Sequence, residues 1–401
     1  MKNSEVVTLI LAGGKGERLG VLTNEMPKSA ITFGGVHRLI DFALSNCRHS
    51  KVGNVGIVTQ YRGRYLADYI GCGSQWLPEC RSSNITVLPH RVRDATCESF
   101  SGTADAVLMN CGFIEAKNPK NVLVITGDHV YRMDYSKVLK THEESGAAAT
   151  IAAVNVPLLE ASRFGIILTD KKNAIIDYKE KPLIPKSYLA SMGVYVFNWA
   201  ALKKHLLIAS ASSKSSLDIG RDIIPRMMIT GQNLVAHRFH GYWKELDNIF
   251  CLWETSMELL SPSPGIDLYD DNWKVIGRNK SRLIRHKLTN DDNASISDSL
   301  VAEGADIKGT VTKSIVSADV EIGKDARIID SVIMPGAKIG KGSVVLKAII
   351  GSGATVEDYT AIGCVRPDGK YLDNYRGVSA IGGNAKVSTC RAGLLKTTPA
   401  Q

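Results

Sequence analysis

Three glycines stand within four positions directly after a short apolar run, at Gly13, Gly14 and Gly16. Glycine lets the backbone turn tightly, so that its N–H groups can approach a bound anion closely. Lys15 and Arg18 add positive charge to this segment, which favours a phosphate ligand over a simple tight turn. The segment has neither the ending of a Walker A loop nor the glycine spacing of a dinucleotide-binding loop. We therefore interpret it as a phosphate-binding loop of another class.

A second candidate follows the apolar run Val122–Thr126, where Gly127 and Asp128 come next in the chain. Ligands of open α/β sheets bind at the carboxyl ends of the strands. Mg²⁺ is commonly held by one or two carboxylates together with phosphate groups. Asp128 is thus a candidate magnesium ligand, and an Asp that caps the following turn is an equally good explanation of this segment alone.

Two further segments place polar side chains at the ends of expected elements. Gly102 and Thr103 open an expected helix, where backbone donors suit a base edge or a phosphate, although an ordinary N-cap fits equally well. Glu180 and Lys181 follow an expected strand, where the carboxylate suits sugar hydroxyls and the ammonium suits a phosphate. From the sequence alone, a solvated run of charges explains this second pair better.

The elements that must position these residues alternate along the chain up to about residue 260. Short apolar runs rich in β-branched residues predict six strands, at Val6–Leu11, Val55–Thr59, Ile85–Leu88, Val122–Thr126, Thr150–Val156 and Ile175–Tyr178. Helical patterns predict one helix over 103–116 with Thr103 as its N-cap, and another over 135–144 that ends at Gly146. Strands and helices that alternate at this spacing predict a parallel sheet covered on both faces.

A different pattern begins near residue 296. Ile or Val recurs every five or six residues, often with Gly directly after it, at Ile322, Ile328, Ile333, Ile339, Val345, Ile350, Val356 and Ile362. Neither a helix nor an alternating strand has this period, whereas a triangular parallel β-helix does, with the aliphatic residues inside and Gly at its corners. An irregular β-sandwich is the alternative.

These two patterns give the predicted domains. We expect a catalytic domain at 1–260, a linker at 261–295, a hexapeptide-repeat β-helix at 296–364 and an unassigned tail at 365–401. The linker prediction depends on Ser-Pro-Ser-Pro-Gly at 261–265, which is typical of connecting segments.

Composition restricts the classes of function. The 401 residues favour two domains, and 44% hydrophobic with 22% charged residues is ordinary for a globular protein. The net charge of +9 comes from scattered Lys and Arg, which suits anionic small molecules and gives no sign of nucleic-acid binding. No apolar run reaches the roughly 18 residues of a membrane span, and the first one is too short for a signal peptide, so we expect the cytoplasm and no membrane partner. The 8 cysteines include no C-x-x-C pair, which predicts reduced thiols and no zinc framework.

Motifs spread from about Val7 to Gly363 resemble those of the bacterial glucose-1-phosphate adenylyltransferases, also called ADP-glucose pyrophosphorylases. The segments that carry this resemblance include Leu-Ala-Gly-Gly-Lys-Gly-Glu-Arg-Leu at 11–19, Arg-Leu-Ile-Asp-Phe at 38–42, Leu-Ser-Asn-Cys at 44–47, Gly-Thr-Ala-Asp-Ala-Val at 102–107, Gly-Asp-His-Val-Tyr at 127–131, Glu-Lys-Pro at 180–182 and Ser-Met-Gly-Val-Tyr at 191–195. The first loop is shared by all sugar nucleotidyltransferases, whereas several of the others point to the adenylyl branch. The fold that the resemblance implies is α/β, a Rossmann-like nucleotidyltransferase domain with a mostly parallel sheet, followed by a C-terminal left-handed parallel β-helix.

The resemblance implies an allosteric enzyme of bacterial glycogen synthesis that converts ATP and α-D-glucose 1-phosphate to ADP-glucose and diphosphate. It also implies Mg²⁺ as cofactor and a homotetramer or a mixed tetramer with a sister subunit. The residues that it implies for the site are Gly13, Gly14 and Arg18 for the triphosphate, Lys28 for neutralising phosphate charge, Gln60, Gly102 and Thr103 for adenine, Asp128 and Glu245 for the metal, and Phe100, Gly165, Glu180, Lys181 and Ser191 for glucose 1-phosphate, with Lys181 on its phosphate.

The chain departs from the family pattern at three of the relevant positions. Glu245 stands where the family has the second metal-binding Asp, Asp247 where it has Gly, and Phe100 where Tyr is usual. Asp247 is therefore an alternative metal ligand. The first two departures support a second hypothesis, that the chain is a regulatory or weakly active subunit which modulates a catalytic partner. A third hypothesis is another sugar-phosphate nucleotidyltransferase joined to a β-helix acyltransferase, which the lack of His between Ile296 and Ile362 disfavours.

Overall fold

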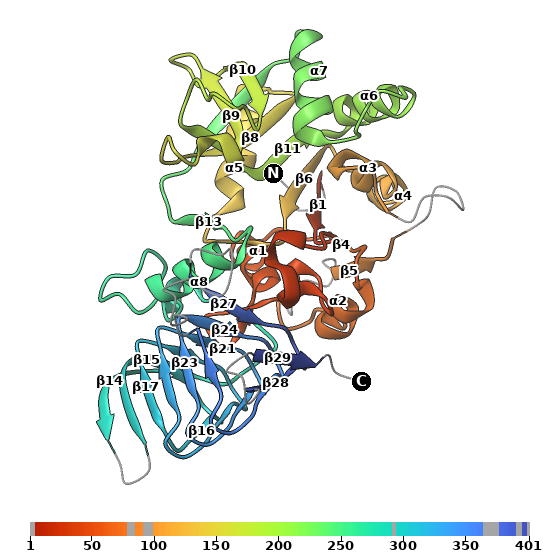
Figure 1. The fold of residues 1–401 in the computed structure, drawn as a ribbon. Helices are drawn as coiled ribbons and strands as arrows, with labels where there is room; N and C mark the ends of the chain where they lie inside the picture. The colour runs from red at the N-terminus through yellow and green to blue at the C-terminus, as the bar shows by residue number, and fades with distance from the viewer. Residues whose placement is uncertain are drawn as a thin grey trace. The chain divides into compact units, whose positions relative to one another are not determined.

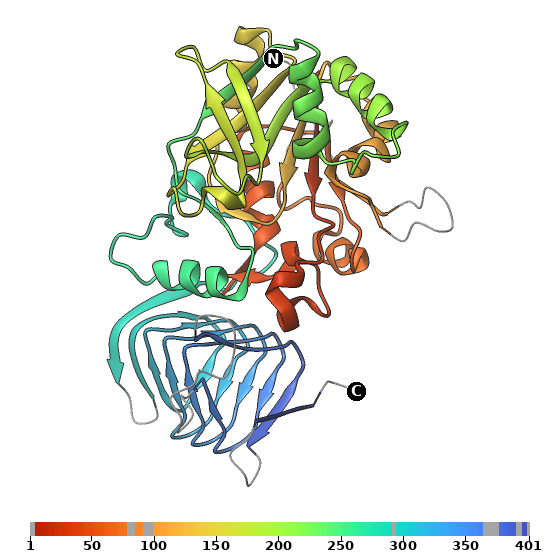
Figure 2. The ribbon, with the colours of Figure 1, turned by 45° about the horizontal axis from the view of Figure 1, so that its top comes forward.

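The computed structural model describes residues 5–77, 85–90, 99–290, 294–363, 377–389 and 395–398. The chain divides into two units (Figures 1 and 2), Met1–Gly14 with Phe42–Trp243, and Lys15–Asp41 with Lys244–Gln401. This division differs from the predicted boundary near residue 260, which stays a prediction. None of the helices in the described ranges is long and apolar enough to cross a membrane.

In the part of the chain that the structure describes, the first unit is built on a nine-stranded sheet, one half of which is parallel. β1 (Val6–Leu11) lies between β4 (Val55–Val58) and β6 (Asn121–Thr126), and β4 pairs in parallel with β5 (Ile85–Leu88). β1, β4 and β6 are almost wholly buried, as expected for apolar strands that are covered on both faces. Because these strands are parallel, their carboxyl ends share one edge of the sheet.

The other half of the sheet is mainly antiparallel. β11 (Leu189–Asn198) runs antiparallel to β6 and to β8 (Ala149–Asn155), and β9 (Gly165–Thr169) pairs antiparallel with β10 (Ile175–Glu180). β12 (Leu234–Arg238) is parallel to β8. The connections from β9 to β10 and from β10 to β11 are too short for parallel crossovers, which need a dozen or more residues. The predicted α/β class is confirmed, with a mixed sheet.

The helices of the described segments are α1 (Leu39–His49), α2 (Gly63–Ile70), α3 (Thr103–Leu108), α4 (Cys111–Glu115), α5 (Tyr135–Ser145), α6 (Trp199–Ser210), α7 (Ile224–Ile229) and α8 (Ile249–Glu258). The single helix expected over 103–116 is thus two helices. Asn110 leaves the helical conformation, and its side-chain amide donates to the carbonyl of Ala106 at 2.8 Å. The predicted N-cap is also wrong, because Gly102 occupies that position. The second predicted helix is confirmed as α5, which ends at Gly146 with φ 59°.

His142 of α5 is buried among polar neighbours of the first unit. Its Nδ1 lies 2.9 Å from Thr150 Oγ1, and its Nε2 lies 3.3 Å from Asn121 Oδ1. Burial, reinforced by the charge of Lys120, lowers the pKa of His142 from 6.5 to about 4. The native protein therefore holds this imidazole neutral over a pH range in which the unfolded chain protonates it.

This histidine is expected to make the protein less stable in mild acid. Between pH 6.5 and pH 4 the unfolded state binds more protons than the native state at His142, so stability falls as the pH falls through that window. From pH 7.5 to pH 5 the wild type is expected to lose about 2 kcal/mol more unfolding free energy than His142→Gln. Urea unfolding at the two pH values measures both losses, and equal losses would contradict this assignment.

The C-terminal part of the second unit confirms the predicted β-helix. Its strands in the described segments are β15 (Ser295–Ala302), β16 (Asp306–Ile307), β17 (Thr310–Thr312), β18 (Ile315–Val316), β19 (Glu321–Ile322), β20 (Arg327–Ile329), β21 (Val332–Ile333), β22 (Lys338–Ile339), β23 (Val344–Leu346), β24 (Ala348–Ile350), β25 (Thr355–Val356), β26 (Ala361–Ile362), β27 (Ser379–Ile381) and β28 (Lys386–Thr389). Each pairs in parallel with a strand of a neighbouring coil. The eight aliphatic residues singled out in the sequence all lie inside, none more than 3% exposed.

Antiparallel strands flank the coils at both ends. β14 (Leu283–Asn290), within the segment expected as a linker, pairs with β15, and β29 (Leu395–Thr398) pairs with β28. The remaining strands of the described residues are short: β2 (Thr32–Phe33), β3 (His37–Arg38), β7 (His129–Tyr131) and β13 (Trp243–Glu245). β27, β28 and β29 lie in the segment expected as an unassigned tail, whose residues 365–376 are outside the described residues, as are Cys80, Cys97, Cys364 and Cys390.

The glycines that follow the inward aliphatic residues lie close to the next coil. A Cβ added to Gly323 would stand 2.8 Å from the backbone N of Lys341 and 3.0 Å from the carbonyl carbon of Gly340. These neighbours are backbone atoms and cannot rotate away, so the coils can stack at this corner only if Gly323 has no side chain.

Gly323→Ala is therefore expected to destabilise the protein by about 2 kcal/mol through overpacking. Gly112→Ala is the matched control, because a Cβ on that helical glycine would meet nothing within 4 Å. The control is expected to be neutral or slightly stabilising, since Ala restricts the unfolded chain. Urea unfolding followed by circular dichroism compares the two variants, and equal stability of both would refute the close-packing argument.

Candidate active site

The carboxyl ends of β4, β1 and β6 form one continuous edge in the first unit. The backbone N of Ala12 donates to the carbonyl of Val58 at 2.9 Å, and that of Gly127 donates to the carbonyl of Leu11 at 2.9 Å. The glycine loop after β1 and Asp128 after β6 therefore leave the sheet side by side. This is the edge at which open α/β sheets bind ligands.

Gly13 and Gln60 lie together at this edge. A Cβ on Gly13 would stand 2.9 Å from Gln60 Cβ, and the backbone N of Tyr61 donates to the carbonyl of Gly13 at 3.2 Å. Gly14 is exposed, and a Cβ there would meet nothing within 4 Å. Gly13 is thus needed for the close approach of two backbone segments, whereas Gly14 leaves its own backbone open to solvent.

Asp128 is a partly exposed carboxylate beside a buried histidine. Its Oδ1 lies 3.6 Å from His129 Nε2, and the Asp128 side chain is 25% exposed. His129 is fixed on its other side, since its Nδ1 lies 3.0 Å from Thr126 Oγ1 and 3.2 Å from the carbonyl of Met192. The ring of His129 also packs edge-on against Trp243, with ring centroids 5.3 Å apart.

A bulge in β11 lies against the end of β6. The pairing of β11 with β8 shifts register between Ser191 and Tyr195, and Gly193 within the bulge has φ 69°. A Cβ on Gly193 would stand 2.8 Å from Thr126 Oγ1 and 3.4 Å from His129 Cε1. The bulge also brings two hydroxyls together, because Ser191 Oγ donates to Tyr195 Oη at 3.1 Å. Ser191 therefore belongs to the same region as the Asp128 edge.

Glu180 is surrounded by a hydroxyl and two glycines. Tyr178 donates its hydroxyl to Glu180 Oε2 at 2.7 Å, and Glu180 pairs across the ladder with Gly165. A Cβ on Gly165 would stand 2.7 Å from Glu180 Oε2, and one on Gly220 would stand 2.9 Å from Tyr178 Oη. Both glycines are needed because the carboxylate and the phenol take up the space of a side chain.

The electrostatics of this cluster follow from its burial. Burial raises the pKa of the Glu180 carboxyl, opposed by the hydrogen bond from Tyr178, while Asp218 raises the pKa and Lys181 lowers it. Burial also raises the pKa of Tyr178 well above its usual value, so that this phenol stays a donor. Lys181 is exposed, and within the described segments its ammonium makes no hydrogen bond or ion pair. Its charge is therefore available to an anion next to Glu180.

Gly102 and Thr103 are engaged by the protein itself. Thr103 Oγ1 donates to Asp218 Oδ2 at 2.9 Å and accepts from the backbone N of Ile219 at 2.9 Å. The N–H groups at the start of α3 donate to the carbonyl of Leu217, at 2.8 Å from Ala104. The start of α3 is thus occupied by the segment before α7. Among the roles expected for the site residues, the binding of a base edge at this helix start has the least support from these contacts.

Phe100 lies at the margin of the first unit's core. Its ring packs edge-on against His90, with centroids 4.5 Å apart, and it contacts the buried cluster of that unit. The contacts of Phe100 are therefore apolar and aromatic.

In the second unit, Arg18 is paired with Asp247. Arg18 Nη1 lies 2.7 Å from Asp247 Oδ2, and the two side chains are 62% and 4% exposed. Asp247 Oδ1 accepts from the side-chain amide of Asn248 at 2.8 Å. Both oxygens of Asp247 are therefore engaged, which argues against Asp247 as the alternative metal ligand. Glu245, at the end of β13, is half-buried.

Lys28 lies against the turn of the glycine loop. Gly16 has φ 70°, and a Cβ there would stand 2.9 Å from Lys28 Cβ. Lys28 itself is 7% exposed. The loop residues Gly16 to Arg18 and Lys28 are thus held together within the second unit.

Three residues of the Glu180 cluster, Tyr178, Tyr195 and Asp218, are not among the site residues predicted from the sequence. Tyr178 was within reach, because a residue two positions before Glu180 in a strand points to the same face. Tyr195 joins Ser191 only through the bulge, and Asp218 comes from a distant segment, so no local pattern identifies either.

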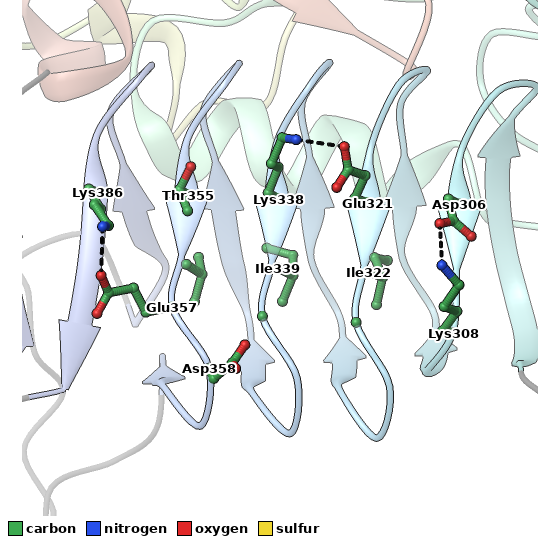
Figure 3. A pocket seen from close by; sticks show the side chains of 13 residues that line it. Asp306, Lys308, Glu321, Ile322, Lys338, Ile339, Thr355, Glu357, Asp358 and Lys386 are labelled. Carbon is green, nitrogen blue, oxygen red and sulfur yellow. Dashed lines mark hydrogen bonds and ion pairs between the residues drawn. The ribbon is translucent and has the colours of Figure 1, made fainter.

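A separate cavity of about 580 Å³ lies on one face of the β-helix (Figure 3). Six of the charged side chains that line it form three ion pairs, at 2.7 Å between Lys308 and Asp306 and between Lys338 and Glu321, and at 2.9 Å between Lys386 and Glu357. Each of these lysines already has a carboxylate partner on the same face. The charges of this face are therefore largely neutralised within the β-helix.

The sequence of this chain matches family models and known proteins over most of its length. The nucleotidyl transferase family model matches residues 7–261, and the GlmU-like C-terminal hexapeptide model matches residues 282–371. A glucose-1-phosphate adenylyltransferase of Clostridium botulinum (strain Alaska E43 / Type E3) is 43% identical over 332 residues, which are 83% of this chain and 85% of that protein. The chain belongs to the glucose-1-phosphate adenylyltransferase family.

Other members of the glucose-1-phosphate adenylyltransferase family are similar over comparable lengths. The protein of Clostridium perfringens (strain SM101 / Type A) is 44% identical over 84% of this chain and 86% of its own length. That of Clostridium beijerinckii (strain ATCC 51743 / NCIMB 8052) is 45% identical over 89% of this chain and 92% of its own length. The predicted family and enzyme class, a nucleotidyltransferase, are confirmed.

Proposed function

We propose that the protein transfers the adenylyl group of ATP to α-D-glucose 1-phosphate, which gives ADP-glucose and diphosphate for glycogen synthesis. The observation that carries the proposal is the cluster around Glu180, which combines a carboxylate, several hydroxyls and an ammonium that has no hydrogen bond or ion pair among the described residues. These are the groups that a sugar phosphate needs. The names of the relatives support this choice of substrates.

At the sugar end, Glu180 would accept hydrogen bonds from glucose hydroxyls. The Tyr178 hydroxyl and the two neighbouring glycines fix its carboxylate in place. Ser191 would donate to another hydroxyl, and Lys181 would hold the phosphate by its charge. Gly165 supplies the close backbone approach, and Phe100 an apolar margin.

At the nucleotide end, we assign Gly13, Gly14 and Arg18 to the triphosphate of ATP, with Lys28 neutralising phosphate charge. Gln60 lies against Gly13 and would read adenine. Gly102 and Thr103 complete the set of residues proposed for the nucleotide. Thr103 would bind it through its backbone, since its hydroxyl already donates to Asp218.

The cofactor is proposed to be Mg²⁺, held by Asp128 and Glu245. The donors fit this ion, because Asp128 presents a partly exposed carboxylate at the binding edge and Mg²⁺ takes few carboxylates when phosphates supply the other oxygens. When bound, the ion would neutralise charge on the phosphates. The ring of His129 lies beside the Asp128 carboxylate, with Nε2 3.6 Å from Oδ1.

The reaction forms one phosphorus–oxygen bond and breaks another. A phosphate oxygen of glucose 1-phosphate attacks the α-phosphorus of ATP, and the bond to the β-phosphate breaks, so that diphosphate leaves. In-line displacement of this kind depends on positioning and on stabilisation of charge. Arg18, Lys28 and Lys181 supply the positive charge in this proposal, and no covalent intermediate is needed.

The proposal includes the cytoplasm as the place of reaction, where both substrates are metabolites. It also includes a homotetramer or a mixed tetramer with a sister subunit, on the resemblance to the family. Light scattering of the pure chain at several concentrations measures the assembly, and a monomer would contradict it.

The function is tested with the pure chain, Mg²⁺, glucose 1-phosphate and ATP. Formation of ADP-glucose with an equal amount of diphosphate is expected, and replacement of ATP by UTP or GTP is expected to lower the rate strongly. Equal rates with UTP would favour another sugar nucleotidyltransferase. Absence of product, with ATP bound normally in calorimetry, would favour a regulatory subunit.

A further inference from the structure

The ion pair between Arg18 and Asp247 joins two segments that are 229 residues apart in the chain. The two side chains differ greatly in exposure, at 62% for Arg18 and 4% for Asp247. A mostly exposed guanidinium is thus attached to a carboxylate that solvent hardly reaches. Such a pair is stronger than an ordinary surface ion pair, because water screens its buried partner poorly.

Asp247 is itself fixed by the start of α8. Its Oδ1 accepts from Asn248 Nδ2 at 2.8 Å, and Asn248 Oδ1 accepts from the backbone N of Cys251 at 2.9 Å. Asn248 is the N-cap of α8, so its side chain is held by the helix. Asp247 therefore presents Oδ2 to Arg18 from a rigid support.

Arg18 needs such a support because its own segment is an irregular one. It lies in a short 3-10 stretch, Glu17–Thr23, in which Gly20 has φ 52° and interrupts the helical conformation. The neighbouring Leu19 is fully buried and anchors the backbone there. The long Arg18 side chain would lose its fixed direction without a partner, and ordering it would then oppose ligand binding.

The pair leaves most of the guanidinium free. Arginine has five N–H donors, and the bond to Asp247 is the only hydrogen bond of this side chain within the described ranges of the chain. An anion can therefore bind the exposed N–H groups of Arg18, while the hydrogen bond from Arg18 to Asp247 stays in place. Breaking the pair would take a close cation away from a buried carboxylate, which is unfavourable.

We propose that Asp247 is a positioning residue, which holds the Arg18 guanidinium in the direction required to bind a nucleotide phosphate. This inference rests on the proposed function for the role of Arg18. Asp247 does not touch the nucleotide. It acts through Arg18, so its effect must vanish when Arg18 is replaced.

The test is a double-mutant cycle with Asp247→Ala, Arg18→Gln and the double variant, read as KM for ATP and kcat. Asp247→Ala is expected to raise KM for ATP about tenfold, of the order found for coupled neighbouring charges, with a smaller change in kcat. In the Arg18→Gln background, Asp247→Ala is expected to add no more than about twofold. Asp247→Asn is expected to fall between wild type and Asp247→Ala, because an amide oxygen still accepts from the guanidinium.

A matched control is Glu258→Ala, which breaks another 2.7 Å ion pair of the same unit, that between Lys244 and Glu258. KM for ATP is expected to stay unchanged in this control. An equal effect of Asp247→Ala with and without Arg18 would overturn the inference, since it would show a general structural role. A fall in KM for ATP would also overturn it, because Asp247 would then restrain Arg18 from binding.

The same cycle is repeated as ATP affinity in calorimetry, so that failure of the proposed function can be recognised. If the wild type binds ATP and forms no ADP-glucose, the proposed function fails, and the coupling between Arg18 and Asp247 in ATP affinity still decides the inference. If the wild type binds no ATP, both fail.

Discussion

Asp128→Asn is expected to lower kcat for ADP-glucose formation about a hundred- to a thousandfold, of the order lost when one electrostatic group of a transition state is removed. The exchange keeps the size of the side chain and removes its charge. The neutral amide remains beside His129, so the local packing is expected to survive. The measurement is diphosphate release at saturating ATP and glucose 1-phosphate, over a range of Mg²⁺ concentrations.

The matched control is Asp134→Asn. Asp134 is the N-cap of α5 and accepts from the backbone N of Ser136 at 3.0 Å, which Asn does equally well. The control is expected to keep wild-type activity and stability. If Asp128→Asn is as active as the control at every Mg²⁺ concentration, Asp128 is not the metal ligand.

Lys181→Gln is expected to raise KM for glucose 1-phosphate about a hundredfold, the usual order when one partner of a close charge pair is removed. The Lys181 ammonium has no hydrogen-bond or ion-pair partner in the segments that the structure describes, and it stands directly after Glu180. The variant removes its charge and keeps most of its length. KM for ATP is expected to change much less, because Lys181 is proposed to bind the phosphate of glucose 1-phosphate.

Lys179→Gln is the control for this second prediction. Lys179 is an exposed residue of β10, next to Glu180 and therefore on the opposite face of the strand. It is expected to leave both KM values unchanged. Equal rises in KM for the two substrates in Lys181→Gln would mean that the lysine supports the fold of the site and does not bind the sugar phosphate.

The parts of the fold that the sequence predicts best are those with a strict period. Aliphatic residues at every fifth or sixth position predicted the coils, because each inward position of a β-helix has the same neighbours above and below. The apolar runs of β1 and β6 predicted buried parallel strands and, through them, the edge of the sheet that Gly13 and Asp128 share.

Other features of the fold and of the site depend on contacts between segments that are far apart in the chain. No local sequence pattern reveals such contacts. The N-cap expected at Thr103 was wrong because its hydroxyl binds Asp218, which lies 115 residues further along the chain. The bulge that joins Ser191 to Tyr195 depends on a register shift against β8. The partner of Arg18 was equally hidden, because Asp247 lies 229 residues further along the chain.

The strands that flank the coils have a consequence for aggregation. An open end of a parallel stack offers a row of unpaired backbone groups onto which a coil of another molecule could add, and repeated addition would give fibres. Here β14 pairs with β15 of the first coil and β29 pairs with β28 of the last coil, each in the antiparallel sense. β14 also exposes Arg285 and Lys287 along its length. Charged side chains on a terminal strand disfavour pairing with a like strand, so Arg285 and Lys287 oppose the addition of another coil at β14.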